Sequence, residues 1–260
     1  MCCLFLAASS TVAIAQTSVV DLVNPIIGTN GMGHTFPGAC VPFGLVQLSP
    51  DTDTIPHNVD GKYQPRSYEY CAGYQHKDSS IVGFSHTHFS GTGHSDLGDI
   101  LIMPTTGTLK LNPGTATNPD GGYRSRFSHD TEISRPGYYE VMLADYGVKA
   151  QLTTTQRVGI HKYTYPTNSE NQRIILDMIH GIYNYDGKVL WTNIRVENDT
   201  LVTGYRITNG WARTNYTYFA MSFSKPITHY GCEEKAKVNY RGGYAKFNMK
   251  ENFPDIGGRK

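Results

Sequence analysis

Histidines and hydroxyl side chains are concentrated in residues 83–99, Gly-Phe-Ser-His-Thr-His-Phe-Ser-Gly-Thr-Gly-His-Ser-Asp-Leu-Gly-Asp. His86 and His88 are two residues apart, so on an extended backbone their imidazoles point the same way. Together with His94 and two nearby aspartates, this spacing is compatible with a metal site in a β fold. The same side chains could bind sugar hydroxyls, or they could satisfy buried backbone groups. The spacing alone leaves these three interpretations open.

Residues 28–44 form a second candidate segment, Gly-Thr-Asn-Gly-Met-Gly-His-Thr-Phe-Pro-Gly-Ala-Cys-Val-Pro-Phe-Gly. Its glycines are not spaced as in a nucleotide-binding loop and no lysine follows them, which disfavours phosphate binding. Such glycines let the backbone approach a ligand or a partner domain closely, although an irregular structural segment is an equally good interpretation. A third group could stack its rings on sugars or simply pack in a sheet: Arg66, Tyr68, Tyr70, Tyr74, Gln75, His76 and Asp78.

No catalytic nucleophile or acid–base pair can be chosen from the sequence. The G-x-S-x-G motif of α/β-hydrolases is absent. The carboxylate pair of a glycoside hydrolase is recognised by its separation in space, which spacing along the chain does not give. We therefore assign no catalytic residue and no metal ligand.

Short strands must position these segments. Tyr, Thr and Gly are abundant, which favours pleated surfaces and tight turns. Val148, Ala150 and Leu152 alternate with polar residues, which predicts a half-buried strand paired with its predecessor across the loop 145–147. The pattern predicts an all-β fold, a large antiparallel sandwich. Its expected strands are 44–49, 81–85, 99–104, 108–111, 138–144, 148–154, 157–165, 173–180, 188–196, 201–208, 216–224 and 238–249.

The composition excludes several classes of protein. Of the 260 residues, 23 are basic and 22 acidic, so the net charge of +1 gives no indication of binding to nucleic acid. No stretch after the N-terminus approaches the roughly 20 apolar residues of a membrane span. Cys40, Cys71 and Cys232 allow one internal disulfide at most, and we expect buried thiols instead.

The N-terminus resembles the remainder of an export signal. Residues 3–15 carry no charge, and Ala13-Ile14-Ala15 fits a small-x-small cleavage site. We therefore expect residues 1–15 to be a signal-peptide remnant and the protein to be periplasmic or extracellular. Residues 16–260 are expected to form one domain, because no shift in composition marks an internal linker.

The sequence as a whole resembles family 92 glycoside hydrolases. The resemblance runs from about residue 20 to the end, and its most specific stretch is 81–93, Ile-Val-Gly-Phe-Ser-His-Thr-His-Phe-Ser-Gly-Thr-Gly. The other matching stretches are 24–29, 33–39, 42–47, 70–74, 96–99, 103–104, 126–129 with Glu132, and 136–139.

The resemblance implies an exported, calcium-dependent exo-α-mannosidase that inverts the anomeric centre of terminal α-mannosides in glycans. Such an enzyme has an N-terminal sandwich like that of galactose mutarotases and a helical (α/α)6 domain that supplies the acid, the base and the calcium ligands. This chain would correspond to the sandwich alone. It is expected to be truncated at its C-terminal end and to be inactive without a helical partner in cis or in trans.

The sandwich is expected to form one wall of the sugar pocket. The resemblance assigns this role to His34, Thr35, Phe36, Tyr74, Ser85, His86, Thr87 and His88. We also expect an exposed apolar surface for the missing domain, around Met32, Phe36, Phe43, Phe84 and Phe89. Two alternatives are a stand-alone carbohydrate-binding module and a metal-dependent β-fold enzyme that uses His86, His88 and His94.

Overall fold

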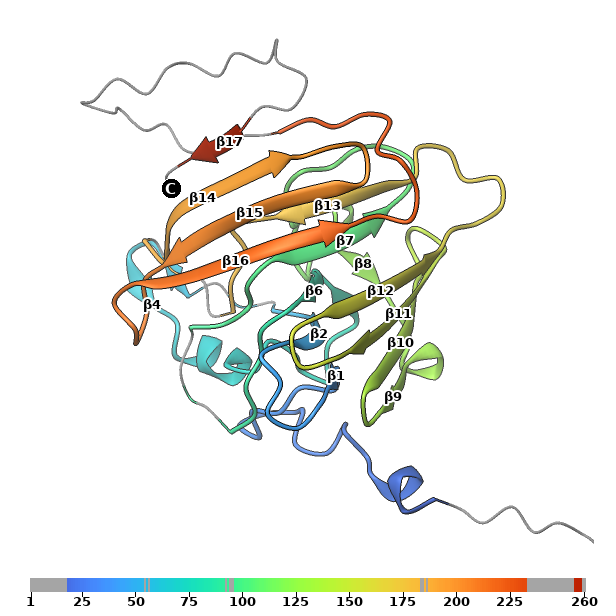
Figure 1. The fold of residues 1–260 in the computed structure, drawn as a ribbon. Coiled ribbons are helices and arrows are strands. Elements are labelled where there is room, and N and C mark those ends of the chain that lie inside the picture. Colours follow the sequence, from blue (N-terminus) through green and yellow to red (C-terminus); the bar gives the residue numbers. More distant parts are fainter. Residues whose placement is uncertain are drawn as a thin grey trace, which may run out of the picture.

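Antiparallel sheets make up nearly all of the regular structure (Figure 1). The computed structural model describes residues 18–232, apart from 54, 56, 92, 94, 95, 183, 184 and 186, and also the backbone of 255–258. Its helices are single 3-10 turns or little more: η1 (Val19–Leu22), η2 (Pro65–Tyr70), η3 (Pro119–Gly121) and η4 (His129–Thr131). The all-β fold predicted from the sequence is confirmed, and no helix of the described residues is long and apolar enough to cross a membrane.

The central layer is a five-stranded sheet whose strands lie in the order β1-β2-β6-β7-β13. Its middle strands are almost entirely buried, because both of their faces are covered by other parts of the chain. The strands are β1 (Ala39–Cys40), β2 (Gln47–Asp51), β6 (Gly83–Ser85), β7 (Leu101–Thr105) and β13 (Arg173–Asp177).

A four-stranded sheet packs against this layer and completes the core. Its order is β12-β11-β10-β9, with the strands β9 (Ile133–Arg135), β10 (Tyr138–Leu143), β11 (Val148–Thr154) and β12 (Gly159–Thr164). Val148, Ala150 and Leu152 are buried as predicted, together with Leu48 and Phe84 of the central sheet. Burial of these apolar faces is the main favourable contribution to folding.

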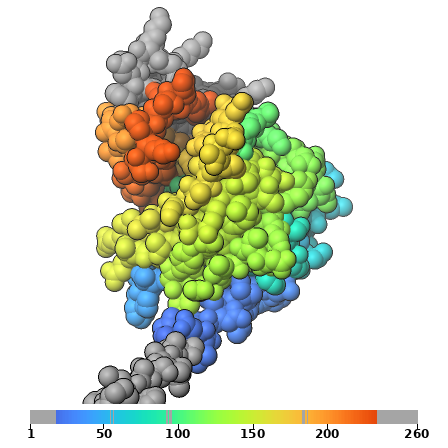
Figure 2. All heavy atoms as spheres, turned by 90° about the vertical axis from the view of Figure 1, so that its right-hand side faces the viewer, coloured from blue at the N-terminus to red at the C-terminus, as the bar shows by residue number. Residues whose placement is uncertain are grey.

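A third sheet has the order β16-β15-β14-β17, and two short ribbons, β3-β4 and β5-β8, complete the described fold. Figure 2 shows that residues 201–232 lie at one end of the molecule, and the N-terminal segment lies at the other. The strands are β14 (Val189–Val196), β15 (Leu201–Thr208), β16 (Asn215–Ser222), β17 (Asp255–Gly258), β3 (Asn58–Val59), β4 (Lys62–Tyr63), β5 (Ser80–Ile81) and β8 (Ser125–Arg126).

Some details differ from the prediction. The strand expected at 44–49 begins only at Gln47, because Gly44 closes a turn onto the carbonyl of Val41. The strand expected at 108–111 is wrong: these residues pair with no described strand, and Leu109 stays half exposed. The strand expected at 238–249 lies outside the described residues. Of the cysteines expected to be buried thiols, Cys71 is buried, whereas Cys40 and Cys232 are exposed.

Candidate functional site

The two candidate loops of the sequence meet in space. The backbone N–H of Gly91 donates to the carbonyl of His34 at 2.7 Å. The rings of Phe36 and His88 lie 5.3 Å apart. The side chain of Gln75 holds the first loop in place. Its Oε1 accepts from the backbone N–H of Gly31 at 2.7 Å, and its Nε2 donates to the carbonyl of Gly31 at 2.9 Å. The described residues of the loops 28–44 and 86–98 therefore lie against one another.

His34 is the best placed of the predicted site residues to reach a ligand or a partner. Its backbone has a φ of +50°, a left-handed conformation that a residue other than glycine adopts at a cost. Its ring is only 8% exposed and makes an edge contact with Tyr68, with centroids 5.0 Å apart. Among the described residues, nothing hydrogen-bonds the Nε2 atom of His34. A buried polar atom without a partner is rare, and it indicates a missing ligand, water or domain.

Thr35 and Phe36 follow His34 and are half-buried. The hydroxyl of Thr35 donates to the carbonyl of Ile27 at 2.9 Å, which closes the loop on itself. Gly28 has a φ of +83° and no room for a side chain beside Thr35, so this turn needs glycine. The loop is therefore held in one shape by its own residues.

His86 connects its loop to strand β12. Its Nδ1 lies 2.6 Å from the carbonyl of Ile100, and its Nε2 lies 3.0 Å from the Nε2 of His161. Burial lowers the pKa of His86, and burial together with the neighbouring His86 places the pKa of His161 well below its ordinary value. Two imidazoles this close cannot both be protonated without repulsion, so at neutral pH one donates to the other.

Thr87 belongs to a second buried network. Its hydroxyl donates to Asp99 Oδ2 at 2.7 Å and accepts from the backbone N–H of Asp99 at 2.9 Å. The other oxygen of Asp99 forms an ion pair with Arg206 Nε at 2.8 Å, and both side chains are almost fully buried. Arg206 also donates to the carbonyl of Met178. The network joins this loop to the third sheet.

Ser85 and His88 belong to a third network, centred on Asp51. His88 Nε2 lies 2.8 Å from Asp51 Oδ1 and 3.3 Å from Ser85 Oγ, while its Nδ1 faces the carbonyl of Gln47 at 2.7 Å. His180 Nε2 contacts the other oxygen of Asp51 at 2.8 Å. Burial alone would raise the pKa of Asp51, but the two imidazoles outweigh it and hold that pKa well below its ordinary value.

These contacts show what the residues at 85–88 do in the fold. Each side chain is engaged with another part of the chain, and His88 is completely buried. His86 and His88 have no hydrogen-bond partner in common. Neither belongs to a group of three metal-ligating side chains among the described residues. His94, the third residue of the metal-site alternative, lies outside the described residues.

Tyr74, the last of the predicted residues, lies in the core with 1% of its surface exposed. Its hydroxyl donates to both carboxylate oxygens of Glu132, at 2.8 and 2.9 Å. Burial and the Glu132 carboxylate raise the pKa of Tyr74 far above its ordinary value, so the hydroxyl stays protonated. His76 and His129 lie beside the same carboxylate, and these three can offer ligand atoms within 4.8 Å of one another.

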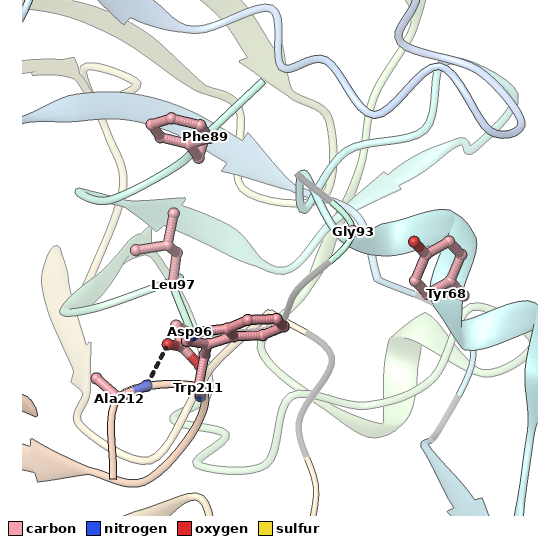
Figure 3. Close-up of a pocket in the computed structure, with 7 residues that line it drawn as sticks. All are labelled: Tyr68, Phe89, Gly93, Asp96, Leu97, Trp211 and Ala212. Carbon is pink, nitrogen blue, oxygen red and sulfur yellow. Dashed lines mark hydrogen bonds between the residues drawn. The ribbon is translucent and has the colours of Figure 1, made fainter. Parts of the chain in front are cut away.

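A hollow of about 560 Å³ opens beside the paired loops. It is lined by residues of the second loop, by η2 and by the connection between β15 and β16 (Figure 3). Trp211 is 79% exposed and Phe89 is 60% exposed, so most of each side chain is open to solvent. Asp96 accepts from the backbone N–H groups of Trp211 and Ala212, at 2.6 and 3.1 Å, which fixes the position of the tryptophan. The lining residues are Tyr68, Phe89, Gly93, Asp96, Leu97, Trp211 and Ala212.

The sequence analysis did not select Trp211. It lies more than a hundred residues along the chain from the loop that contains Asp96, and the sequence around it has no unusual polar motif. One signal was available: a tryptophan beside Asn209-Gly210, in a turn, has little apolar surface to pack against. An exposed aromatic ring in a hollow is suited to stacking on the apolar face of a sugar.

Comparison with known proteins gives this surface its family. The sequence profile of the Glycosyl hydrolase family 92 N-terminal domain matches residues 22–254. The fold and its loops therefore define an N-terminal domain of glycoside hydrolases, and the chain belongs to family 92. This confirms the resemblance drawn from the sequence.

Solved structures and a curated relative agree. The chain is 40% identical to the family 92 α-mannosidase BT3965 of Bacteroides thetaiotaomicron, solved with mannoimidazole, with a TM-score of 0.76 over 92% of this chain. The family 92 glycosyl hydrolase ccman5 is 26% identical over 77% of this chain, with a TM-score of 0.60. An uncharacterized secreted glycosidase of Arthroderma benhamiae is 29% identical over 170 residues, 62% of this chain. The chain spans 29% and 26% of the two solved structures and 19% of the curated relative.

Proposed function

We propose that this chain is the carbohydrate-binding wall of an exported, inverting exo-α-mannosidase that acts on terminal α-mannosides of glycans. The family membership and the 40% identity to an α-mannosidase support the class of reaction. Export is supported by the apolar N-terminal segment and by the secreted relative. Hydrolysis requires a second, helical domain, in cis or in trans, and the chain alone is inactive.

The observation that carries the proposal is the unpaired Nε2 of His34 on a loop whose shape is fixed. Tyr68 connects this ring to the hollow, since it contacts His34 and also lines the cavity with Trp211 and Phe89. Sugar recognition needs one or more hydrogen-bonding groups beside an aromatic face, and this corner of the molecule offers both. A mannose unit or the edge of a helical domain would satisfy His34.

This chain positions the sugar and does not supply the chemistry. An inverting hydrolase needs two carboxyl groups about 6.5–9.5 Å apart with a water molecule between one of them and the sugar. The aspartates beside the candidate site are already engaged, Asp51 with two imidazoles, Asp99 with Arg206, and Asp96 with the backbone of the β15–β16 connection. The chain's contribution is to orient the mannose and to keep bulk water from one side of the pocket.

The calcium ion that the family resemblance implies does not fit the described residues. Calcium takes six to eight oxygen ligands. The metal-ligating group that the described part of the chain contains has two imidazoles and one carboxylate, which is too rich in nitrogen. We therefore place the calcium ligands in the helical domain and derive no step of the reaction through this chain's residues.

Complementation tests the proposal. The purified chain is assayed with an aryl α-mannoside and calcium, alone and together with the separately expressed helical domain of a family 92 α-mannosidase. We expect no turnover by the chain alone, and calcium-dependent release of mannose, initially as the β-anomer, by the mixture. His34→Ala and Trp211→Ala are expected to lower the activity of the mixture at least tenfold, while the matched exposed variant Tyr216→Ala leaves it unchanged.

Two results would contradict the proposal. One is turnover by the chain alone that is lost when one of its own acidic residues is replaced. The other is a helical domain that binds this chain but has the same activity in its presence as in its absence. Tight binding of manno-oligosaccharides by the isolated chain, with no complementation, would favour the stand-alone binding module, which the exposed rings of Trp211 and Phe89 make the second candidate.

A further inference from the structure

We propose that His76, His129 and Glu132 form a binding site for a divalent transition metal of the class that imidazole ligands prefer, with Zn²⁺ as the ion that tests it. The three side chains can each offer a ligand atom, and these atoms lie within 4.8 Å of one another. In a tetrahedral zinc site, with metal–ligand distances of about 2.0–2.1 Å, ligand atoms lie roughly 3.4 Å apart. Small side-chain rotations bring the present arrangement to that spacing. The inference does not depend on the proposed function.

The carboxylate is already held in place. Glu132 follows η4 directly, and its side chain is only 3% exposed. Tyr74 and Tyr139 donate to it from the core, with the Tyr139 hydroxyl 2.6 Å from Oε1. Outer hydrogen-bond donors of this kind orient the ligands of known metal sites. Two buried tyrosines on one carboxylate thus fix its direction before any metal binds.

The two imidazoles are placed on the other side of this carboxylate. The ring centroids of His76 and His129 lie 4.0 Å apart, with an angle of 38° between the planes. His129 Nδ1 lies 2.6 Å from Glu132 Oε2, and Phe127 supports the ring edge-on at 5.0 Å. The backbone N–H of His76 donates to the carbonyl of Thr29, which fixes the position of the second imidazole. A cation would replace the direct contact between His129 and Glu132.

The donors select the metal. Imidazole suits Zn²⁺, Cu²⁺, Ni²⁺ and Fe²⁺, whereas Ca²⁺ and Mg²⁺ prefer oxygen alone. Two neutral imidazoles and one carboxylate leave a fourth tetrahedral position for water, and the His129 side chain is 37% exposed, so solvent reaches the site. A metal here would join η4 to the segment after η2, more than fifty residues earlier in the chain, and so act as a structural clasp beside the loop 28–44.

Metal titration tests the assignment. The whole chain, freed of metals with a chelator, is titrated with ZnCl₂ by calorimetry and with CoCl₂ by visible absorption, in the presence of millimolar Ca²⁺. We expect one Zn²⁺ per chain, a Co²⁺ spectrum of four-coordinate type, and no competition from Ca²⁺. His129→Ala and His76→Ala should weaken binding about 100-fold, and Tyr74→Phe about tenfold, because it removes only an outer donor.

The control is His229→Ala, an exposed histidine outside the cluster, which should bind zinc like the unmodified chain. Each variant is checked by far-UV circular dichroism, and the exposed ring of His129 makes its replacement the one that preserves the fold. Zinc should also raise the melting temperature of the unmodified chain, but not that of His129→Ala. The absence of stoichiometric zinc binding, or equal affinity in the His76→Ala, His129→Ala double variant, would overturn the proposal.

Discussion

At the scale of single residues, the chain contains two neighbouring aspartates with opposite electrostatic environments. Asp51 lies between two imidazoles, and its pKa is well below the ordinary value near 3.8. Burial raises the pKa of Asp53 to about 6, because its hydrogen bond from the backbone of Ile55 and the more distant charges do not compensate. The carboxylate of Asp51 therefore stabilises the fold at neutral pH, and that of Asp53 opposes it.

We expect Asp51→Asn to lower the free energy of unfolding by about 3–5 kcal/mol at pH 7, because it removes the buried carboxylate that both imidazoles contact. The folded pKa of Asp51 is depressed, so its contribution is fully present above pH 4 and is lost as the pH falls toward the folded value. The difference in the free energy of unfolding between the unmodified chain and the variant should therefore become smaller below pH 4. Urea unfolding at pH 7, 5, 4 and 3 measures it.

Asp53→Asn is the matched control, and its expected effect on stability at neutral pH has the opposite sign. The folded pKa of Asp53 is raised, so its ionisation costs stability as the pH rises from about 4 to 6. This variant should be about as stable as the unmodified chain at pH 4 and more stable by up to about 3 kcal/mol at pH 7, because two pKa units correspond to roughly that free energy. Equal destabilisation by both variants at pH 7 would show that a generic loss of packing, and not charge, explains the Asp51 effect.

At the scale of elements, the strands were far easier to predict than the contacts between loops. The strands predicted at 148–154 and 201–208 match β11 and β15 at both ends, because one buried face leaves an alternating pattern along the chain. The contact of Asp51 with His180 spans 129 residues and leaves no such pattern. His129 and Glu132 were visible as neighbours in the sequence, but only the fold shows that His76 lies beside them.

The same strand gives a prediction about the core. Leu152→Ala in β11 should lower the free energy of unfolding by about 2–5 kcal/mol, because it opens a cavity between the two packed sheets. Lys149→Ala, on the other face of the same strand, should cost less than about 1 kcal/mol, since it removes only a surface ion pair with Glu140. Chemical denaturation of both variants measures the contrast, and similar losses would contradict the packing of the β12-β11-β10-β9 sheet against the central sheet.

At the scale of the whole molecule, the candidate loops and the residues beside them expose several large apolar side chains to solvent. Ile27, Met32, Phe43, Leu45 and Phe89 are each 60% exposed or more. Of the residues expected in this surface, Phe84 is instead buried in the central sheet, because it lies within β6 and not on the loop that follows. A large exposed apolar patch usually marks an interaction surface, and we propose that these side chains form the surface for the helical domain.

The double variant Phe43→Ser, Phe89→Ser should keep the stability of the chain within about 0.5 kcal/mol, because both rings lie outside the core. It should bind less of a fluorescent dye for apolar surfaces and should no longer associate with a family 92 helical domain. Phe84→Ser is the contrasting variant and should unfold the chain. Unchanged dye binding and unchanged association in the double variant would argue that the partner docks elsewhere.

The three networks around His86, Thr87 and His88 also limit how this segment can be engineered. The loop is anchored through His161, through Asp99 with Arg206, and through Asp51 with His180, on strands and connections far apart in the sequence. Grafting residues 83–99 onto another sandwich would leave behind the side chains outside this segment that hold it in place. A transplant that reproduces the shape of this loop must therefore carry at least His161, Arg206, Asp51 and His180 as well.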